Sequence, residues 1–92
     1  MKKDLPFKEK KIENKSFRTF FENVNNDELK WHRDYEDRIV RVRETTDWML
    51  QLDNQLPVVL ETNKDYFIPK GLYHRVIKGT GNLNVEIDLM KL

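Results

Sequence analysis

The stretch that decides the fold is FIPKGLYHR, residues 67–75. It has the pattern of a strand, a tight turn and a second strand. Proline fixes φ and donates no backbone hydrogen bond, so Pro69 suits the end of a strand. Gly71 supplies the positive φ that a tight turn often needs. We therefore predict that His74 opens the second strand, at the mouth of whatever the strands enclose.

A second polar group lies further upstream, where His32 and Asp34 are separated by one residue. In an extended chain alternate residues face the same side, so these two side chains are expected to point together. Two histidines and one carboxylate are the ligand set of a facial-triad metal site. We therefore predict that His32, Asp34 and His74 bind a divalent metal ion. Imidazole and carboxylate ligands suit Fe(II), Mn(II), Ni(II) or Zn(II).

The composition excludes several classes of protein. A chain of 92 residues is expected to form one domain. Its 17 basic and 16 acidic residues nearly cancel, so no electrostatic argument favours a nucleic-acid or membrane partner. Without cysteine it has no thiolate metal ligands, and without a glycine-rich phosphate loop no nucleotide cofactor is expected. No apolar run approaches the ~20 residues of a membrane span, and no signal peptide is evident, so we expect a cytoplasmic location.

The N-terminal part divides into two segments. Residues 1–15 are rich in lysine and lack a period, and we interpret them as an arm before a single domain of residues 16–92. Ser16 suits a helix N-cap. Four apolar residues then follow helical spacing, and they are Phe17, Phe20, Phe21 and Val24. The sequence therefore predicts one short N-terminal helix that covers one face or end of the β-structure.

The rest of the chain has the two-residue period of strands. It is visible in residues 38–43 and 48–52, and most clearly in residues 83–90, where apolar and polar residues alternate. Turn-forming residues lie between these segments. About six or seven short strands with regular turns favour an all-β sandwich or barrel.

The stretch of residues 67–75 resembles the second sequence motif of the cupin family, a strand followed by Pro-x-Gly-x-x-His and another strand. Pro69, Gly71 and His74 match that motif residue for residue. The resemblance covers roughly residues 29–89. It implies an all-β fold, a cupin-type jelly-roll β-barrel, here with one short N-terminal helix.

The first cupin motif, His-x-His followed by a glutamate, is degenerate in this chain. His32 matches the first histidine, Asp34 stands in place of the second, and Arg38 or Ile39 stands in place of the glutamate. The usual site of three histidines and one glutamate is therefore replaced by His32, Asp34 and His74. The alternative is a metal-free cupin, in which these residues are polar groups at the barrel mouth.

The orientation of Arg38 has two alternatives. If the strand runs unbroken from Asp34, Arg38 shares its face, points into the barrel beside the metal position and can receive an anionic ligand in a bidentate fork. A cation there would weaken metal binding and stabilise the ionised form of Asp34. If a bulge or loop intervenes at residues 35–37, Arg38 faces solvent or pairs with Glu36, as most arginines are exposed.

Trp48 and Tyr66 are candidates for lining a ligand pocket, although aromatic residues in such strands are more often core. Together with Arg38 they form the predicted ligand-binding set, and no catalytic residue is assigned. Two classes of function follow. One is a metal-dependent cupin of dioxygenase, isomerase or lyase type, or a binder of a small anionic or sugar-like molecule. The other is a metal-free binding or interaction module.

A homodimer is the expected assembly. A chain of this length builds only a modest core. The arm of residues 1–15 holds Leu5, Phe7 and Ile12, which need cover. An arm that pairs with the sheet edge of a partner would cover both the arm and the edge.

Overall fold

The computed structural model describes residues 7–25 and 29–90, and every regular element within these ranges is a β-strand. Among these residues no helix is long and apolar enough to span a membrane. The strands are β1 (Phe7–Ile12), β2 (Lys15–Phe20), β3 (Asp37–Val42), β4 (Met49–Leu52), β5 (Val58–Val59), β6 (Tyr66–Ile68), β7 (His74–Ile77) and β8 (Leu83–Met90). The all-β prediction is confirmed.

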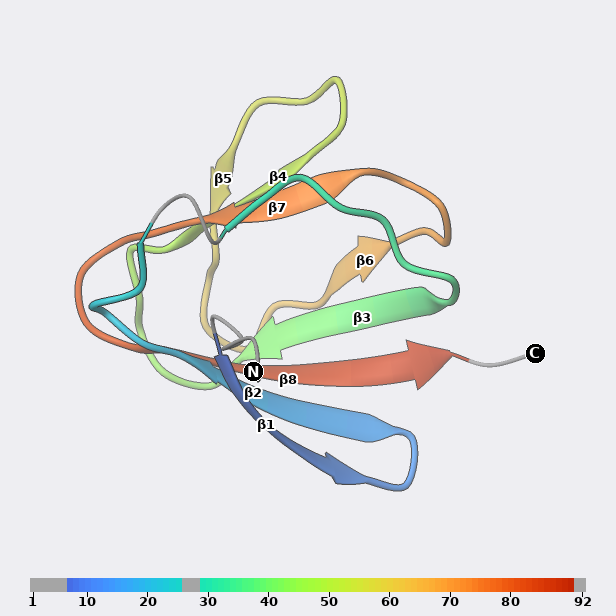
Figure 1. Ribbon diagram of the computed structural model, residues 1–92, viewed down its shortest axis with the longest axis horizontal. Coiled ribbons are helices and arrows are strands. Elements are labelled where there is room, and N and C mark those ends of the chain that lie inside the picture. Colours follow the sequence, from blue (N-terminus) through green and yellow to red (C-terminus); the bar gives the residue numbers. More distant parts are fainter. Residues whose placement is uncertain (1–6, 26–28, 91–92) are drawn as a thin grey trace, which may run out of the picture.

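The strands form two sheets that face each other. One has five strands in the order β1-β2-β8-β3-β6, and the other has three in the order β5-β4-β7. Figure 1 shows the three-stranded sheet above the five-stranded one. The predicted jelly-roll barrel is confirmed only in part, because the two sheets are not joined into one hydrogen-bonded ring. The architecture is an open, two-sheet form of the predicted fold.

The core lies between the sheets. Alternate residues of β3 and β8 supply it, because each strand turns one face inward. Val42 pairs with Val85 in register, and both are buried. From the other sheet Trp48 and Leu50 fill the same layer, and Trp48 is fully buried. The indole N–H of Trp48 donates a hydrogen bond to the Gly81 carbonyl at 3.0 Å, so its one polar atom is satisfied.

The predicted N-terminal helix is absent, and the segment forms β2 instead. Ser16 and Phe20 are buried and Arg18 is largely so, whereas Phe17 on the opposite face is exposed. This alternation follows a strand period. β2 pairs with β1 on one side and with the long strand β8 on the other. Pairing on both sides satisfies the backbone of β2 and overrides the helical spacing of its phenylalanines.

The predicted arm contributes a strand to the same fold. Its residues 7–12 form β1, which pairs with β2 of this chain at the edge of the five-stranded sheet. Residues 1–6 of the arm, with Leu5, lie outside the described residues. The sequence would end the predicted helix at residues 25–27, and residues 26 and 27 also lie outside the described ranges.

Candidate metal centre

The three predicted ligands come from two segments that lie side by side. His74 is the first residue of β7. The segment that carries His32 and Asp34 runs along the free edge of β7 before it crosses to β3 in the other sheet. His32 and His74 exchange two backbone hydrogen bonds, of 3.0 and 2.8 Å. The backbone thus fixes the two histidines opposite each other.

The Pro-x-Gly turn is held against the same crossing segment. Gly71 has a φ of 81°, the left-handed conformation that glycine adopts without strain. Its N–H donates to the Asp34 carbonyl at 2.9 Å, and the Lys70 N–H donates to the Asp37 carboxylate at 2.7 Å. The strand, turn and strand predicted over residues 67–75 are confirmed as β6, the turn and β7. The turn sets the position of both Asp34 and His74.

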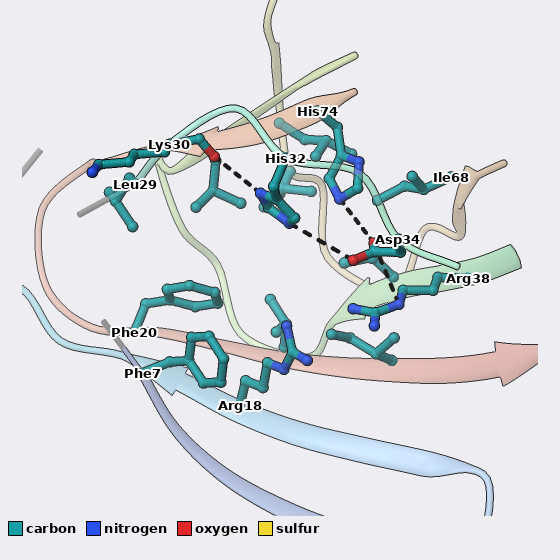
Figure 2. Close-up of a pocket in the computed structure, with 16 residues that line it drawn as sticks. Phe7, Arg18, Phe20, Leu29, Lys30, His32, Asp34, Arg38, Ile68 and His74 are labelled. Carbon is teal, nitrogen blue, oxygen red and sulfur yellow. Dashed lines mark hydrogen bonds and ion pairs between the residues drawn. The ribbon is translucent and has the colours of Figure 1, made fainter. Parts of the chain in front are cut away.

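The side chains of His32, Asp34 and His74 converge on one point (Figure 2). One ligand atom from each residue lies within 4.8 Å of the others. The Nε2 of His74 is 3.1 Å from Oδ2 of Asp34, and the Nε2 of His32 is 4.0 Å from Oδ1. His74 is buried, whereas His32 is about half exposed at 51%. These separations suit atoms that share one ion after small adjustments.

Both histidines present the same ring nitrogen to the site. The Nδ1 of His32 lies 2.9 Å from the Lys30 carbonyl, and that of His74 lies 2.9 Å from the Leu72 carbonyl. A carbonyl only accepts, so each Nδ1 must carry the hydrogen. Nε2 is then the nitrogen that faces Asp34: it donates to the carboxylate when the ring is protonated and offers a lone pair to a metal ion when the ring is neutral. Such a backbone bond on the far nitrogen is the usual support of a metal-binding histidine.

Asp34 is the least satisfied group of the site. Its Oδ2 is buried and makes no hydrogen bond of good geometry among the described residues, although Nε2 of His74 and Nε of Arg38 lie 3.1 and 3.4 Å away as ion-pair partners. Burial on its own would raise the pKa of Asp34, but the nearby His74, Arg38 and His32 outweigh it and lower the pKa below its usual range. The group is therefore an ionised carboxylate whose Oδ2 is ion-paired but not hydrogen-bonded. A carboxylate between two imidazole nitrogens fits a divalent cation.

Arg38 lies beside Asp34 on the inner face of β3. Its Nε is 3.4 Å from Oδ2 of Asp34, and its Nη2 is 2.6 Å from Glu36. Only 14% of its side chain is exposed. Val40 and Val42 continue the same buried face, which is the register of an unbroken strand from residue 38. Arg38 is thus inward and paired with Glu36 at once, a combination of the two alternatives above.

The triad opens onto a cavity of about 390 Å³ between the sheets. Its wall is mostly apolar and includes Phe20, Leu50, Leu60, Ile68, Val76, Val85 and Ile87. Two of the predicted ligand-binding residues do not reach it. Trp48 is fully buried in the core. Tyr66 faces a different hollow, and its hydroxyl bonds to the backbone of Glu61 and Val59.

Three cavity residues were missed by the sequence interpretation. Phe7 comes from β1, and Arg18 and Phe20 come from β2. Assigning these segments to an arm and a helix removed them from the pocket. Residues 15–20 carry no two-residue alternation of apolar and polar residues, so the sequence contains no strand signal here.

No protein-family model matches the sequence, and no curated protein sequence matches it. Solved structures do match. A chain from crystal structures of DMSP lyases has a TM-score of 0.70 and 14% identity, over 84% of this chain and 37% of that one. A cupin domain from Bordetella pertussis has a TM-score of 0.65 and 20% identity, over 99% of this chain and 100% of that one.

Hydroxypropylphosphonic acid epoxidase from S. wedmorenis has a TM-score of 0.66 and 16% identity. That match covers 83% of this chain and 42% of the epoxidase. This chain therefore spans about two fifths of the lyase and epoxidase chains. HppE has been crystallised as its Fe(II) form and as a Co(II) form with substrate, and both structures match with TM-scores of 0.66 and 0.65.

Proposed function

The chain has the fold of a small cupin domain, and from this premise we propose that it binds a divalent metal ion through His32, Asp34 and His74. The observation that carries the proposal is the meeting of the buried Asp34 carboxylate with two imidazoles whose Nε2 atoms face it, the three ligand atoms lying within 4.8 Å of one another. Three protein ligands leave coordination positions for water or a small molecule. The cavity beside the triad is where that molecule binds.

The residues of the site would have separate roles in binding the ion and the ligand. His32, Asp34 and His74 hold the ion, which supplies a Lewis acid or a redox centre when bound. Arg38 stands next to the carboxylate and receives an anionic group of the ligand. The apolar wall excludes water and holds the body of the ligand. Metal-dependent chemistry of the dioxygenase, isomerase or lyase type is consistent with this arrangement.

Metal binding is tested by calorimetric titration of Mn(II), Fe(II) or Zn(II) into protein purified without a histidine tag and treated with a chelator. The wild type should bind one equivalent. His74→Ala should bind at least about 100-fold more weakly, because even the loss of a group that only hydrogen-bonds to a metal ligand costs about 10–100-fold in metal affinity. Glu44→Gln, an exposed residue, is the matched control and should bind like the wild type. Equal affinity of the wild type and His74→Ala would reject the metal site.

A metal-free binding module is the second candidate, and the position of Arg38 favours it. Its guanidinium lies 3.4 Å from the same oxygen that a metal would use. A cation so placed repels a divalent ion and partly neutralises Asp34. In this case the titration shows no binding by the wild type, while the cavity still takes an anionic molecule.

A further inference from the structure

We propose that Arg18 forms a second anion-binding position in the cavity, and that the ligand is a small molecule with an oxyanion group on a short apolar body. Arg18 projects from β2, in the sheet opposite β7. Figure 2 shows its guanidinium group pointing into the cavity. The position rests on the proposed function only in sharing its cavity, because anion binding by Arg18 requires no metal.

Arg18 is held in one orientation by its neighbours. Only 15% of its side chain is exposed. Its Nε donates to Glu9 at 2.6 Å, and its guanidinium carbon lies 4.3 Å from the centre of the Phe7 ring. Glu9 in turn accepts a hydrogen bond from the fully buried Ser16 hydroxyl. A guanidinium fixed through Nε presents its terminal edge, which matches the two oxygens of a carboxylate or phosphate.

Glu9 keeps the arginine in place as an ionised partner. Burial would raise the pKa of Glu9, but the hydrogen bonds from Ser16 and Arg18 outweigh it and lower the pKa. The pair therefore stays charged at neutral pH. Because Glu9 does not line the cavity, the carboxylate lies behind the arginine and the cation faces the cavity.

The charge of the cavity wall favours an anionic occupant. The lining residues include Arg18, Lys30 and Arg38 but one carboxylate, Asp34. Figure 2 shows the side chain of Lys30 directed away from the cavity, so the two arginines are the inward cations. A bound divalent ion would increase the positive potential further. An anion is the ligand that this wall stabilises, because the two guanidinium groups offer it charge-assisted hydrogen bonds.

The remaining wall defines the body of the ligand. Phe7 and Phe20 pack beside Arg18 with their ring centres 5.1 Å apart. Val85 and Ile87, from the same sheet, also line the cavity. These groups offer no hydrogen bonds and suit a short aliphatic chain or small ring. The recognised class is therefore a short-chain carboxylate, phosphate ester or phosphonate.

The test is an NMR titration of the full chain with butanoate, butylphosphonate and neutral butanamide, each in the presence and absence of EDTA. Both anions should bind the wild type at least about tenfold more tightly than butanamide. The double variant Glu9→Gln, Arg18→Met keeps the net charge and removes the pair. It should lose at least about tenfold in anion affinity, since charged hydrogen bonds are lost. Arg43→Met, whose side chain is 61% exposed, is the control and should bind like the wild type.

Two single variants keep the proposal testable if the double variant does not fold. Arg18→Lys retains the charge without the planar fork and should weaken anion binding severalfold. Glu9→Gln removes the negative charge that neutralises Arg18 and should strengthen anion binding. Anion affinities unchanged by every Arg18 and Glu9 variant, or equal for butanoate and butanamide, would overturn the proposal.

The titrations with and without EDTA also distinguish anion binding by Arg18 from metal binding by the three predicted ligands. Arg18-dependent anion binding in EDTA supports the second position even if His32, Asp34 and His74 bind no metal. Metal binding with an anion affinity that does not depend on Arg18 rejects the second position and leaves the metal site standing.

Discussion

Asp34 and Arg38 carry opposite charges and form an ion pair, so each side chain affects what the other can bind. Asp34 faces two imidazole nitrogens on one side and a guanidinium on the other. A carboxylate already paired with an arginine is a weaker ligand for a metal ion, because part of its charge is neutralised. Metal affinity and anion affinity are therefore linked through one side chain.

Replacing Arg38 separates the two affinities. Arg38→Met keeps an apolar stem on the inner face of β3 and removes the charge next to Asp34. We expect tighter binding of a divalent ion and weaker binding of butanoate, each by about tenfold, in calorimetric titrations. Arg43→Met on the outer face should change neither. A parallel loss of both affinities would show that Arg38 only supports the fold.

Asp47 gives a pH-dependent contribution to stability away from the site. Its carboxylate accepts hydrogen bonds from the Thr80 N–H at 2.8 Å and the Thr80 hydroxyl at 2.9 Å, and these bonds lower the pKa of Asp47. A lowered pKa means that the stabilisation is complete above the ordinary value near 4 and is lost as pH falls through the folded value. Denaturant unfolding of wild type and Asp47→Asn should differ at pH 6 and converge toward pH 2. A difference that does not change with pH would contradict this assignment.

Among the elements, the strands with a clear two-residue period were predicted correctly. β3, β4 and β8 alternate apolar and polar residues, and the turn between β6 and β7 carries its own proline and glycine. β2 was predicted as a helix because Phe17 and Phe20 are three residues apart, which fits a helical period and places them on opposite faces of a strand. What decides between helix and strand is pairing with β8, a contact with the far end of the chain that local spacing does not contain.

The absence of long-range pairing from local spacing also explains which residues of the site were predicted. His32, Asp34 and His74 lie in motifs whose spacing is local, so their meeting followed from the sequence and its resemblance. Arg18 reaches the cavity because β2 lies beside β8. Its place depends on the sheet topology, and a helical interpretation of its segment hides it.

Replacing a phenylalanine by alanine should lower the free energy of unfolding by different amounts on the two faces of β2. Phe20 is buried against Phe7 and Trp48, with ring centres 5.1 and 6.1 Å away, whereas Phe17 is 39% exposed. Phe20→Ala should lower the free energy of unfolding by about 3–5 kcal/mol, the usual cost of a large cavity. Phe17→Ala should lower it by less than about 1 kcal/mol. Similar losses in urea unfolding would point to a helix that buries both residues.

For the whole molecule, the edge strands bear on assembly. β1 forms one edge of the five-stranded sheet and carries exposed Lys8, Lys10 and Lys11, which discourage further pairing along it. β6 forms the other edge, where Phe67 is 51% exposed. If a second copy binds, the edge at β6 is therefore the better candidate than the arm.

The predicted homodimer remains a prediction and has a direct measurement. Light scattering at tens of micromolar protein should give twice the chain mass of 11.2 kDa. Phe67→Lys adds a charge at the β6 edge and should shift the mass to that of one chain, while Phe17→Lys on the other face should not. A monomeric wild type would reject the dimer.

Residues 32–37 cross between two sheets that are not joined into one ring. A metal ion bound at the candidate centre would therefore link one sheet to the other. Asp34 leads into the five-stranded sheet and His74 opens β7 in the other. An ion held by both would close a loop of chain between them, and loop closure restricts the unfolded ensemble much as a disulfide does. Amide hydrogens at the bridge between His32 and His74 would then exchange with solvent more slowly once the ion is bound, while those between β2 and β8 would keep their rates. A site of this kind would regulate how often the two sheets separate, as well as what binds between them.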